Sequence, residues 1–321
     1  MTQENKLHEY DIMFVNVVTP LHNGSGEGLG IVDNPILRER TTQFPIIQAS
    51  SIKGVLRDSY EERGSIDFDM LFGPSPGNGE KHSGAISFGD GQILAFPVRS
   101  VRGCFAWITS PHVLWRFYER LCLMDMESLS SKLTNPLKKV HSGLNKAMVS
   151  PSGKKELYMP KTTQIFLEEF PITCEDSQEI EIIAKVIGEK VYGKDSFLKS
   201  EFEKKFVLVD DDIFRYFVTN ATEIVPNIRI GDSGTTVDGS LRYTEYLPSE
   251  TIMYSTLIFE RSRKKDCALS ATEVKNNFVK YLPTVIQIGG DETTGKGITR
   301  LSLSNLSVNG IAGEKSQEGI E

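Results

Sequence analysis

The chain has 321 residues and a formal net charge of −7, which on its own argues against a protein that coats nucleic acid. The acidic excess is confined to residues 168–212, which hold 13 acidic and 6 basic side chains, and the rest of the chain is balanced. Four widely spaced cysteines exclude a paired-cysteine zinc site, and no apolar run is long enough for a membrane span, so we expect a cytoplasmic protein without membrane contact.

The first part of the chain alternates strands with helices. Runs of β-branched and aromatic residues predict strands, and serine caps ahead of periodic apolar residues predict helices. In chain order we expect a strand at 10–19, a glycine-rich loop at 23–30, a helix capped by Ser50 and Ser51 and running to about Arg63, strands at 85–88 and 93–98 joined by a turn at 89–91, a strand at 105–109, and a helix from Ser110 to about Leu123. Residues 125–165 are polar and contain several prolines and serines, which indicates an insertion or long loops.

The second part repeats this alternation. We expect helices at 179–190 and 213–223, strands within 228–247 around a turn at 232–234, a strand at 251–260, a helix capped by Ser270 and ending at Tyr281, a strand at 285–288, a loop at 289–297 and a strand at 298–303. Strands interleaved irregularly with single helices are typical of an α+β fold rather than a doubly wound sheet. We expect one domain over residues 1–321.

Two titratable residues flank the first glycine-rich loop. His22 precedes its four glycines and Asp33 follows them. The glycine spacing does not fit a dinucleotide-binding loop, and Pro35 stands where such a loop would lead into a helix. The two side chains suit acid–base chemistry or metal binding, but a structural histidine and a turn-forming aspartate explain them equally well.

A second glycine-rich loop, GGDETTGKG at 289–297, nearly matches a P-loop. Gly297 occupies the place of the Mg²⁺-binding Ser or Thr, and a strand follows where a P-loop needs a helix, so NTP hydrolysis is disfavoured. Backbone amides and Lys296 still suit a phosphate group, and the alternative is a plain tight hairpin.

Two basic segments permit contact with nucleic acid. Lys53 and Arg57 lie one turn apart at the start of an expected helix, which suits a phosphate backbone or, alternatively, a solvated amphipathic face. Residues 92–120 contain four arginines, with Phe105, Trp107, Trp115, Phe117 and Tyr118 interleaved. That pattern suits an RNA-binding face or a core strand and helix, and we favour the core for Trp107.

The order of several segments resembles a known family. These segments are HNGSGEGLGIVDNPILRERTTQFPIIQASSIKGVLRD, LFG, CFAWITSPHVLWRF, RIGDSGTTVDGSLRYTEYLP and GGDETTGKG. Together they resemble the RAMP superfamily of CRISPR proteins and, within it, the backbone subunits of type III-B (Cmr) effector complexes. The resemblance covers residues from about 10 to 300.

This resemblance implies a modified ferredoxin-like (RRM-like) core with inserted subdomains. An inserted region is expected at 125–225 and a β-hairpin thumb at 226–247. The resemblance also implies a helical filament of several copies along a CRISPR guide RNA, association with other Cmr effector subunits, and endoribonuclease cleavage of target RNA paired to the guide.

The same resemblance implies roles for individual residues. Asp33 is expected at the cleavage site, with His22 as a weaker assistant and Glu245 as a third candidate. RNA contacts are expected from Arg38, Arg40, Ser50, Ser51, Lys53, Arg57, Gly289, Gly290 and Lys296.

RNA supplies its own nucleophile, the 2′-OH, so the protein mainly has to distort one linkage and neutralise charge. We expect Asp33 to bind a divalent ion, Mg²⁺ or Mn²⁺, rather than to act as general base, because a carboxylate is a weak base for an alcohol. Two alternatives stay open: a guide-binding scaffold without nuclease activity, and a stand-alone RNA-processing endonuclease of the same superfamily.

Overall fold

The computed structural model describes residues 7–28, 30–62, 67–75, 82–140 and 146–305, and these are the residues discussed below. Its core consists of six elements in the chain order β1 (His8–Val17), α1 (Ala49–Glu62), β4 (Gly91–Arg99), β12 (Ile252–Glu260), α9 (Ala271–Tyr281) and β14 (Ile298–Leu303). The four strands lie side by side in the order β14-β1-β12-β4, and every neighbouring pair is antiparallel. A βαββαβ chain with its fourth, first, third and second strands in this order is ferredoxin-like, so the expected core is confirmed.

β1 is the central strand of this core. Seven consecutive residues of it are buried, because α9 and α6 (Gln178–Tyr192) both contact it. A strand covered in this way reads as a continuous apolar run rather than an alternating one, as residues 12–15 do. Pro20 and the glycine-rich loop then carry the chain out of the sheet.

A long segment is inserted between β4 and β12 and extends the same sheet. Its strands are β5 (Phe105–Thr109), β6 (Lys146–Val149), β7 (Gln164–Leu167), β8 (Phe170–Asp176) and β9 (Phe206–Leu208). Its main helices are α3 (Pro111–Leu123), α4 (Glu127–Lys139), α6, α7 (Ser196–Lys205) and α8 (Asp211–Asn220). The strands continue the sheet in the order β4-β5-β9-β6-β8-β7. The expected inserted range, 125–225, lies inside this segment.

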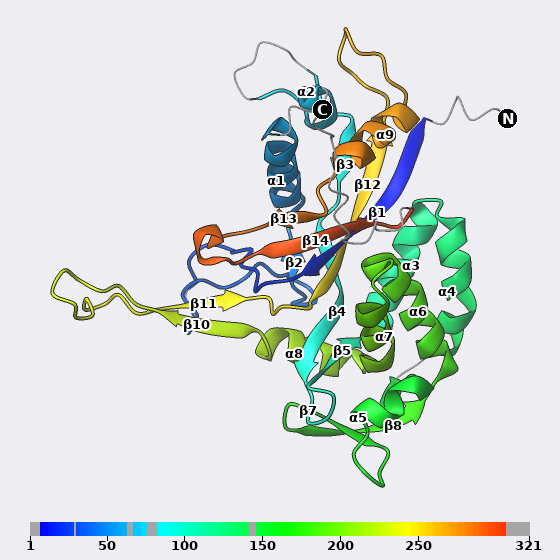
Figure 1. Ribbon diagram of the computed structural model, residues 1–321, viewed down its shortest axis with the longest axis vertical. Helices are drawn as coiled ribbons and strands as arrows, with labels where there is room; N and C mark the ends of the chain where they lie inside the picture. The colour runs from blue at the N-terminus through cyan, green and yellow to red at the C-terminus, as the bar shows by residue number, and fades with distance from the viewer. Residues whose placement is uncertain (1–6, 29, 63–66, 76–81, 141–145, 306–321) are drawn as a thin grey trace, which may run out of the picture.

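A two-stranded hairpin of β10 (Glu223–Asn227) and β11 (Arg242–Tyr246) projects from the body (Figure 1). Its strands begin three residues before the expected thumb range and end one residue before that range ends. Helices α6 and α7 lie on the right of Figure 1, whereas the hairpin and the two glycine-rich loops lie on the left.

Three sequence-based expectations need correction. First, β3 (Ile86–Phe88) and β4 do not form a hairpin around Gly89, because both lie along β12 and the glycine only interrupts the run. Second, α1 begins at Ala49, whose amide donates to Asp90 Oδ1 at 2.8 Å, so Ser50 and Ser51 lie in the first turn and do not cap the helix.

Third, the segment 125–165 is not mainly loop. It contains α4, which buries Leu129, Leu133 and Leu137 at four-residue spacing and includes Pro136. This spacing places the three leucines on one helix face, which is enough to hold the helix against the body. Elsewhere the expected helix end at Arg63 lies outside the described residues.

The remaining short elements complete the sheet and its edges. They are α2 (Phe68–Phe72), β2 (Ile46–Ile47), α5 (Lys154–Leu157) and β13 (Val285–Gln287), with short 3₁₀ turns at Pro151–Gly153 and Glu292–Thr294. β13 pairs with β14 across the second glycine-rich loop, so that loop closes a β-hairpin. None of the helices in the described part of the chain combines the length and apolar character that crossing a bilayer requires.

Candidate functional site

Two glycine-rich loops meet at the base of the β10–β11 hairpin. Leu21 and Leu247 exchange two backbone hydrogen bonds of 2.9 and 2.8 Å, which join the loop after β1 to the end of β11. The amide of Gly290 donates to the carbonyl of His22 at 2.9 Å, which adds the C-terminal loop. Segments from both ends and the middle of the chain therefore build one site.

Asp33 is held against β11. Its Oδ2 atom accepts a 2.7 Å hydrogen bond from the backbone amide of Tyr243, while the amide of Asn34 donates to the carbonyl of Tyr243 at 3.0 Å. Among the described residues, Oδ1 of Asp33 has no hydrogen-bond partner. The carboxylate is thus fixed by one oxygen and presents the other.

His22 is held by the same strand. Its Nδ1 atom lies 2.7 Å from the carbonyl oxygen of Glu245, and because a carbonyl only accepts, Nδ1 carries the proton and donates. In the neutral ring, Nε2 is then an acceptor. A Cβ atom on Gly24 would lie 2.5 Å from Nε2, so glycine is needed there to leave the ring its place.

The anchors of Asp33 and His22 are two residues apart on β11. One is the amide of Tyr243 and the other is the carbonyl of Glu245. At about 3.3 Å per residue, these anchor points are about 7 Å apart. The structure therefore brings the two sequence-predicted residues to one short stretch of strand.

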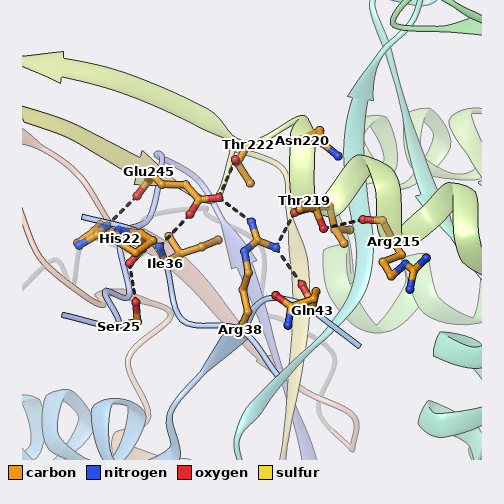
Figure 2. Close-up of polar contacts among 12 residues, drawn as sticks. His22, Ser25, Ile36, Arg38, Gln43, Arg215, Thr219, Asn220, Thr222 and Glu245 are labelled. Carbon is orange, nitrogen blue, oxygen red and sulfur yellow. Dashed lines mark hydrogen bonds and ion pairs between the residues drawn. The ribbon is translucent and has the colours of Figure 1, made fainter. Parts of the chain in front are cut away.

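The side chain of Glu245 is buried and fully engaged. Oε1 accepts hydrogen bonds from Arg38 Nη2 at 2.6 Å and Thr222 Oγ1 at 2.8 Å, and Oε2 accepts from the amide of Ile36 at 3.0 Å. Figure 2 shows Glu245 lying between His22 and Arg38. Because both oxygens already have partners, the geometry gives Glu245 a positioning role rather than the chemical role expected from the sequence.

Arg38 turns inward, so the expectation that it contacts RNA does not fit its geometry. Besides pairing with Glu245, its Nη1 atom donates to the carbonyls of Val218 at 2.8 Å and Gln43 at 3.0 Å (Figure 2). Only 13% of its side chain is exposed. The guanidinium thereby ties the loop after β1 to the end of α8.

Arg57 is also engaged inside the protein. It pairs with Asp69 at 2.6 Å, donates to Ser75 Oγ at 2.9 Å and to the carbonyl of Gly73, and lies over the ring of Phe68. The expectation of a guide-phosphate contact from Arg57 does not fit this arrangement. Its role here is to hold α2 against α1.

Three other residues predicted to bind RNA have side chains without a polar protein partner in the described part of the chain. Arg40 and Ser50 are exposed and Lys53 is half-buried, and none of the three side chains has a polar partner among the described residues. Ser51 instead donates to Asn23 Oδ1 at 3.3 Å, which ties the start of α1 to the first loop. A helix N-terminus with a free lysine in its second turn favours an anion such as phosphate.

Packing against His22 accounts for two glycines of the C-terminal loop. Gly289 has a φ of +90°, and a Cβ there would lie 2.3 Å from the carbonyl oxygen of His22. Gly290 donates its amide to that same oxygen, so neither glycine needs a phosphate to explain it. Lys296, with Nζ 5.0 Å from the ring centre of Tyr246, is the cation that this loop offers.

Tyr246 is a central residue of the site that the sequence did not single out. Its ring meets that of His22 edge-on at 5.6 Å, and its hydroxyl donates to Asp291 Oδ2 at 2.7 Å. Burial, and then Asp291, raise the pKa of Tyr246 to about 12, so the hydroxyl keeps its proton at neutral pH. Alternation along β11 places Thr244 and Tyr246 on one face, but nothing local identifies their partners.

A metal ion would find few protein ligands here. Among the described residues, no three His, Cys, Asp or Glu side chains form a metal-binding group. Asp33 offers one carboxylate oxygen, which fits a Mg²⁺-type ion held mainly by water and phosphate oxygens and does not fit an all-protein cage.

The superfamily can now be assigned. A model of the RAMP superfamily matches residues 14–300. The chain belongs to the RAMP superfamily. The loops that meet at the hairpin base all lie within the matched range of this RAMP protein.

Two curated relatives of this RAMP protein span nearly its full length. The CRISPR system Cmr endoribonuclease Cmr4 of Pyrococcus furiosus is 36% identical over 300 residues, covering 91% of this chain and 95% of the relative. The CRISPR system CMR subunit Cmr4 of Saccharolobus solfataricus is 27% identical over 317 residues, covering 91% and 96%.

Solved RAMP structures share the architecture. A crystal structure of oligomeric Cmr4 from Pyrococcus furiosus has a TM-score of 0.69 at 30% identity, covering 93% of this chain and 98% of that one. A cryo-EM structure of type III-B Cmr-beta bound to cognate target RNA has a TM-score of 0.69 at 19% identity, covering 94% and 99%. At that identity the second likeness concerns the fold alone.

Proposed function

We propose that this protein is the target-RNA-cleaving backbone subunit of a type III-B CRISPR effector complex. It binds a guide RNA, stacks with further copies of itself and with other Cmr subunits in the cytoplasm, and cuts complementary RNA at regular intervals. The 36% identical relative named an endoribonuclease and the oligomeric Cmr4 structure support this assignment.

One observation carries the catalytic part of the proposal. Asp33 is fixed to the hairpin base through Oδ2 and leaves Oδ1 without a partner among the described residues. A purely structural aspartate in a turn would need only the contact through Oδ2. The second oxygen is therefore available to the reacting RNA or to an ion bound to it.

The remaining residues have supporting roles. Arg40, Ser50, Lys53 and Lys296 contact RNA phosphates, and Nε2 of His22 accepts or donates a proton at the reacting linkage. A divalent ion, Mg²⁺ or Mn²⁺, held by Asp33 and RNA phosphate, would neutralise charge that develops on the phosphate. Glu245 and Arg38 hold the loop that carries Asp33.

The test compares assembled complexes that contain the wild-type chain or Asp33→Asn. With labelled complementary RNA and Mg²⁺, the wild type gives regularly spaced cuts, which a chelator abolishes, and the variant gives none while binding guide RNA normally. Asparagine keeps an oxygen for the Tyr243 amide, so loop geometry is preserved. A variant that cuts at the wild-type rate removes Asp33 from the site, and a wild type that binds target without cutting indicates the scaffold alternative.

A further inference from the structure

A side-chain hydrogen bond ties the C-terminal loop to the hairpin. The hydroxyl of Tyr246 donates to Oδ2 of Asp291 at 2.7 Å. Tyr246 is 3% exposed, whereas Asp291 lies at the exposed start of the loop with a left-handed backbone, φ +62°. An aspartate tolerates this conformation, and it places a carboxylate over the end of β11.

The ring of Tyr246 also packs against the ring of His22. The two rings meet at 5.6 Å with an interplanar angle of 63°. On its other contacts, the His22 ring is limited by Gly24 and Gly290, where added Cβ atoms would lie 2.5 and 3.6 Å from ring atoms. A small movement of the tyrosine ring therefore changes where Nε2 of His22 points.

The ring of Tyr246 also contacts Lys296, the cationic residue of the C-terminal loop. Nζ of Lys296 lies 5.0 Å from its centre, in cation–π contact. Asp291 and Lys296 are also joined through the backbone, since the amide of Lys296 donates to the carbonyl of Asp291 at 3.3 Å. Losing the Asp291 carboxylate would release the tyrosine hydroxyl, whereas the backbone bond that holds the turn with Lys296 would remain.

We infer that Asp291 is a positioning residue for RNA cleavage, acting through the Tyr246 hydroxyl to hold the ring of His22 in place. This inference rests on the proposed function. It assigns the acidic residue of the GGDETTGKG loop a role in cleavage geometry, although the loop's basic and glycine content suggests phosphate binding alone. Asp291 itself does not touch the RNA linkage in this role.

The experiment measures single-turnover cleavage and target-RNA affinity in the assembled complex. Asp291→Ala and Tyr246→Phe are each expected to slow cleavage about tenfold with affinity unchanged, because a misplaced catalytic group costs rate and not binding. Asp291→Asn keeps an oxygen acceptor and restores most of the rate. The double variant Asp291→Ala/Tyr246→Phe is no slower than either single variant, because one hydrogen bond is lost in all three.

Glu292→Ala is the matched control. It removes the same charge from the next position, whose side chain is exposed and has no polar partner among the described residues, so it reports any purely electrostatic effect on RNA. If Asp291→Ala prevents assembly, Tyr246→Phe, which keeps the buried ring, carries the test. If the bond has a purely structural role, Asp291→Ala lowers assembly and affinity together with the cleavage rate. Asp291→Asn then restores no one of these three quantities without the others.

Two failures are distinguishable. Wild-type complex that leaves target RNA intact contradicts the proposed function. Wild-type complex that cuts, with Asp33→Asn inactive and Asp291→Ala or Tyr246→Phe as fast as wild type, overturns only the inference about Asp291. Equal slowing by Glu292→Ala also overturns it, because charge would then explain the effect.

Discussion

Oδ2 of Asp33 accepts a hydrogen bond from the backbone amide of Tyr243, 210 positions later in the chain. The carboxylate proposed to act on RNA is thus positioned by the base of the projecting hairpin, not by its own loop alone. Any shift of β11 moves Asp33 with it, and His22 as well, because the carbonyl of Glu245 holds that ring.

The Asp33 contact predicts a difference between two substitutions. Asp33→Ala removes the acceptor of the Tyr243 amide and should lower the free energy of unfolding by about 1 kcal/mol, whereas Asp33→Asn keeps an acceptor and should cost much less. Denaturant unfolding measures both, and hydrogen exchange at the Tyr243 amide should accelerate only in the alanine variant. Equal exchange in the two variants would contradict the contact.

The buried pair of Arg38 and Glu245 predicts a large stability effect. Glu245→Gln places an amide NH₂ against a donor, either Arg38 or the amide of Ile36, and should lower the unfolding free energy by about 3 kcal/mol. The double variant Arg38→Gln/Glu245→Gln should lose less than the two single losses together, since neither charge is left alone. Additive losses would show that the two side chains act independently.

Lys53 and Arg57 should separate RNA binding from stability. Lys53→Ala is expected to weaken guide-RNA binding and to reduce the salt dependence by about one unit of slope, because its ammonium has no protein partner among the described residues. Arg57→Ala should leave RNA binding nearly unchanged but lower the unfolding free energy by about 2 kcal/mol, because its contacts to Asp69 and Ser75 are lost. RNA titrations at several salt concentrations measure binding, and thermal melts measure stability. A loss of binding in Arg57→Ala with a loss of stability in Lys53→Ala would contradict these roles.

Thiol labelling should distinguish the cysteines by burial. Burial raises the pKa of Cys174 from 9.0 to about 12, whereas Cys104 and Cys122 are exposed. At pH 8 only about one Cys174 thiol in ten thousand is ionised, so mass spectrometry should find the exposed pair alkylated first.

The raised pKa of Cys174 also has a stability consequence. The stability linked to this protonated thiol is fully present below pH 9 and is lost as the pH rises toward 12, because the unfolded thiol ionises first. Unfolding melts of Cys174→Ala should show a weaker loss over that range. Rapid modification of Cys174 in the folded protein at pH 8 would contradict the burial.

Local signals were sufficient where the partner of a residue lies nearby in the sequence. Ser110 and Ser270 cap α3 and α9 as expected, because each accepts from an amide three residues ahead. Helix α7 was not anticipated, since Phe202 is its one fully buried side chain and no apolar stripe marks it. The extension of the sheet through β9 depends on its parallel pairing with β5, a segment distant in the sequence, which no short pattern encodes.

The site shows the same division. His22 and Asp33 stood out in the sequence because they flank a glycine-rich loop, and their expected roles came from the family resemblance. The inward turn of Arg38 was not predicted, because Glu245 is 207 positions away and a basic side chain beside a loop normally suggests solvent or phosphate. Tyr246 was likewise missed, since its role depends on Asp291 from another loop.

The position of β1 between β12 and β14 also governs when the site can exist. Met13 pairs with Leu303 and His8 pairs with Glu260. The first strand to leave the ribosome therefore cannot pair until β12 and β14 have been synthesised. At about 5–20 residues per second that delay is tens of seconds, during which an apolar strand is without its neighbours. A nascent chain interrupted before Gly289 would lack the C-terminal loop that packs on His22, so premature termination there should yield inert copies rather than misdirected nucleases.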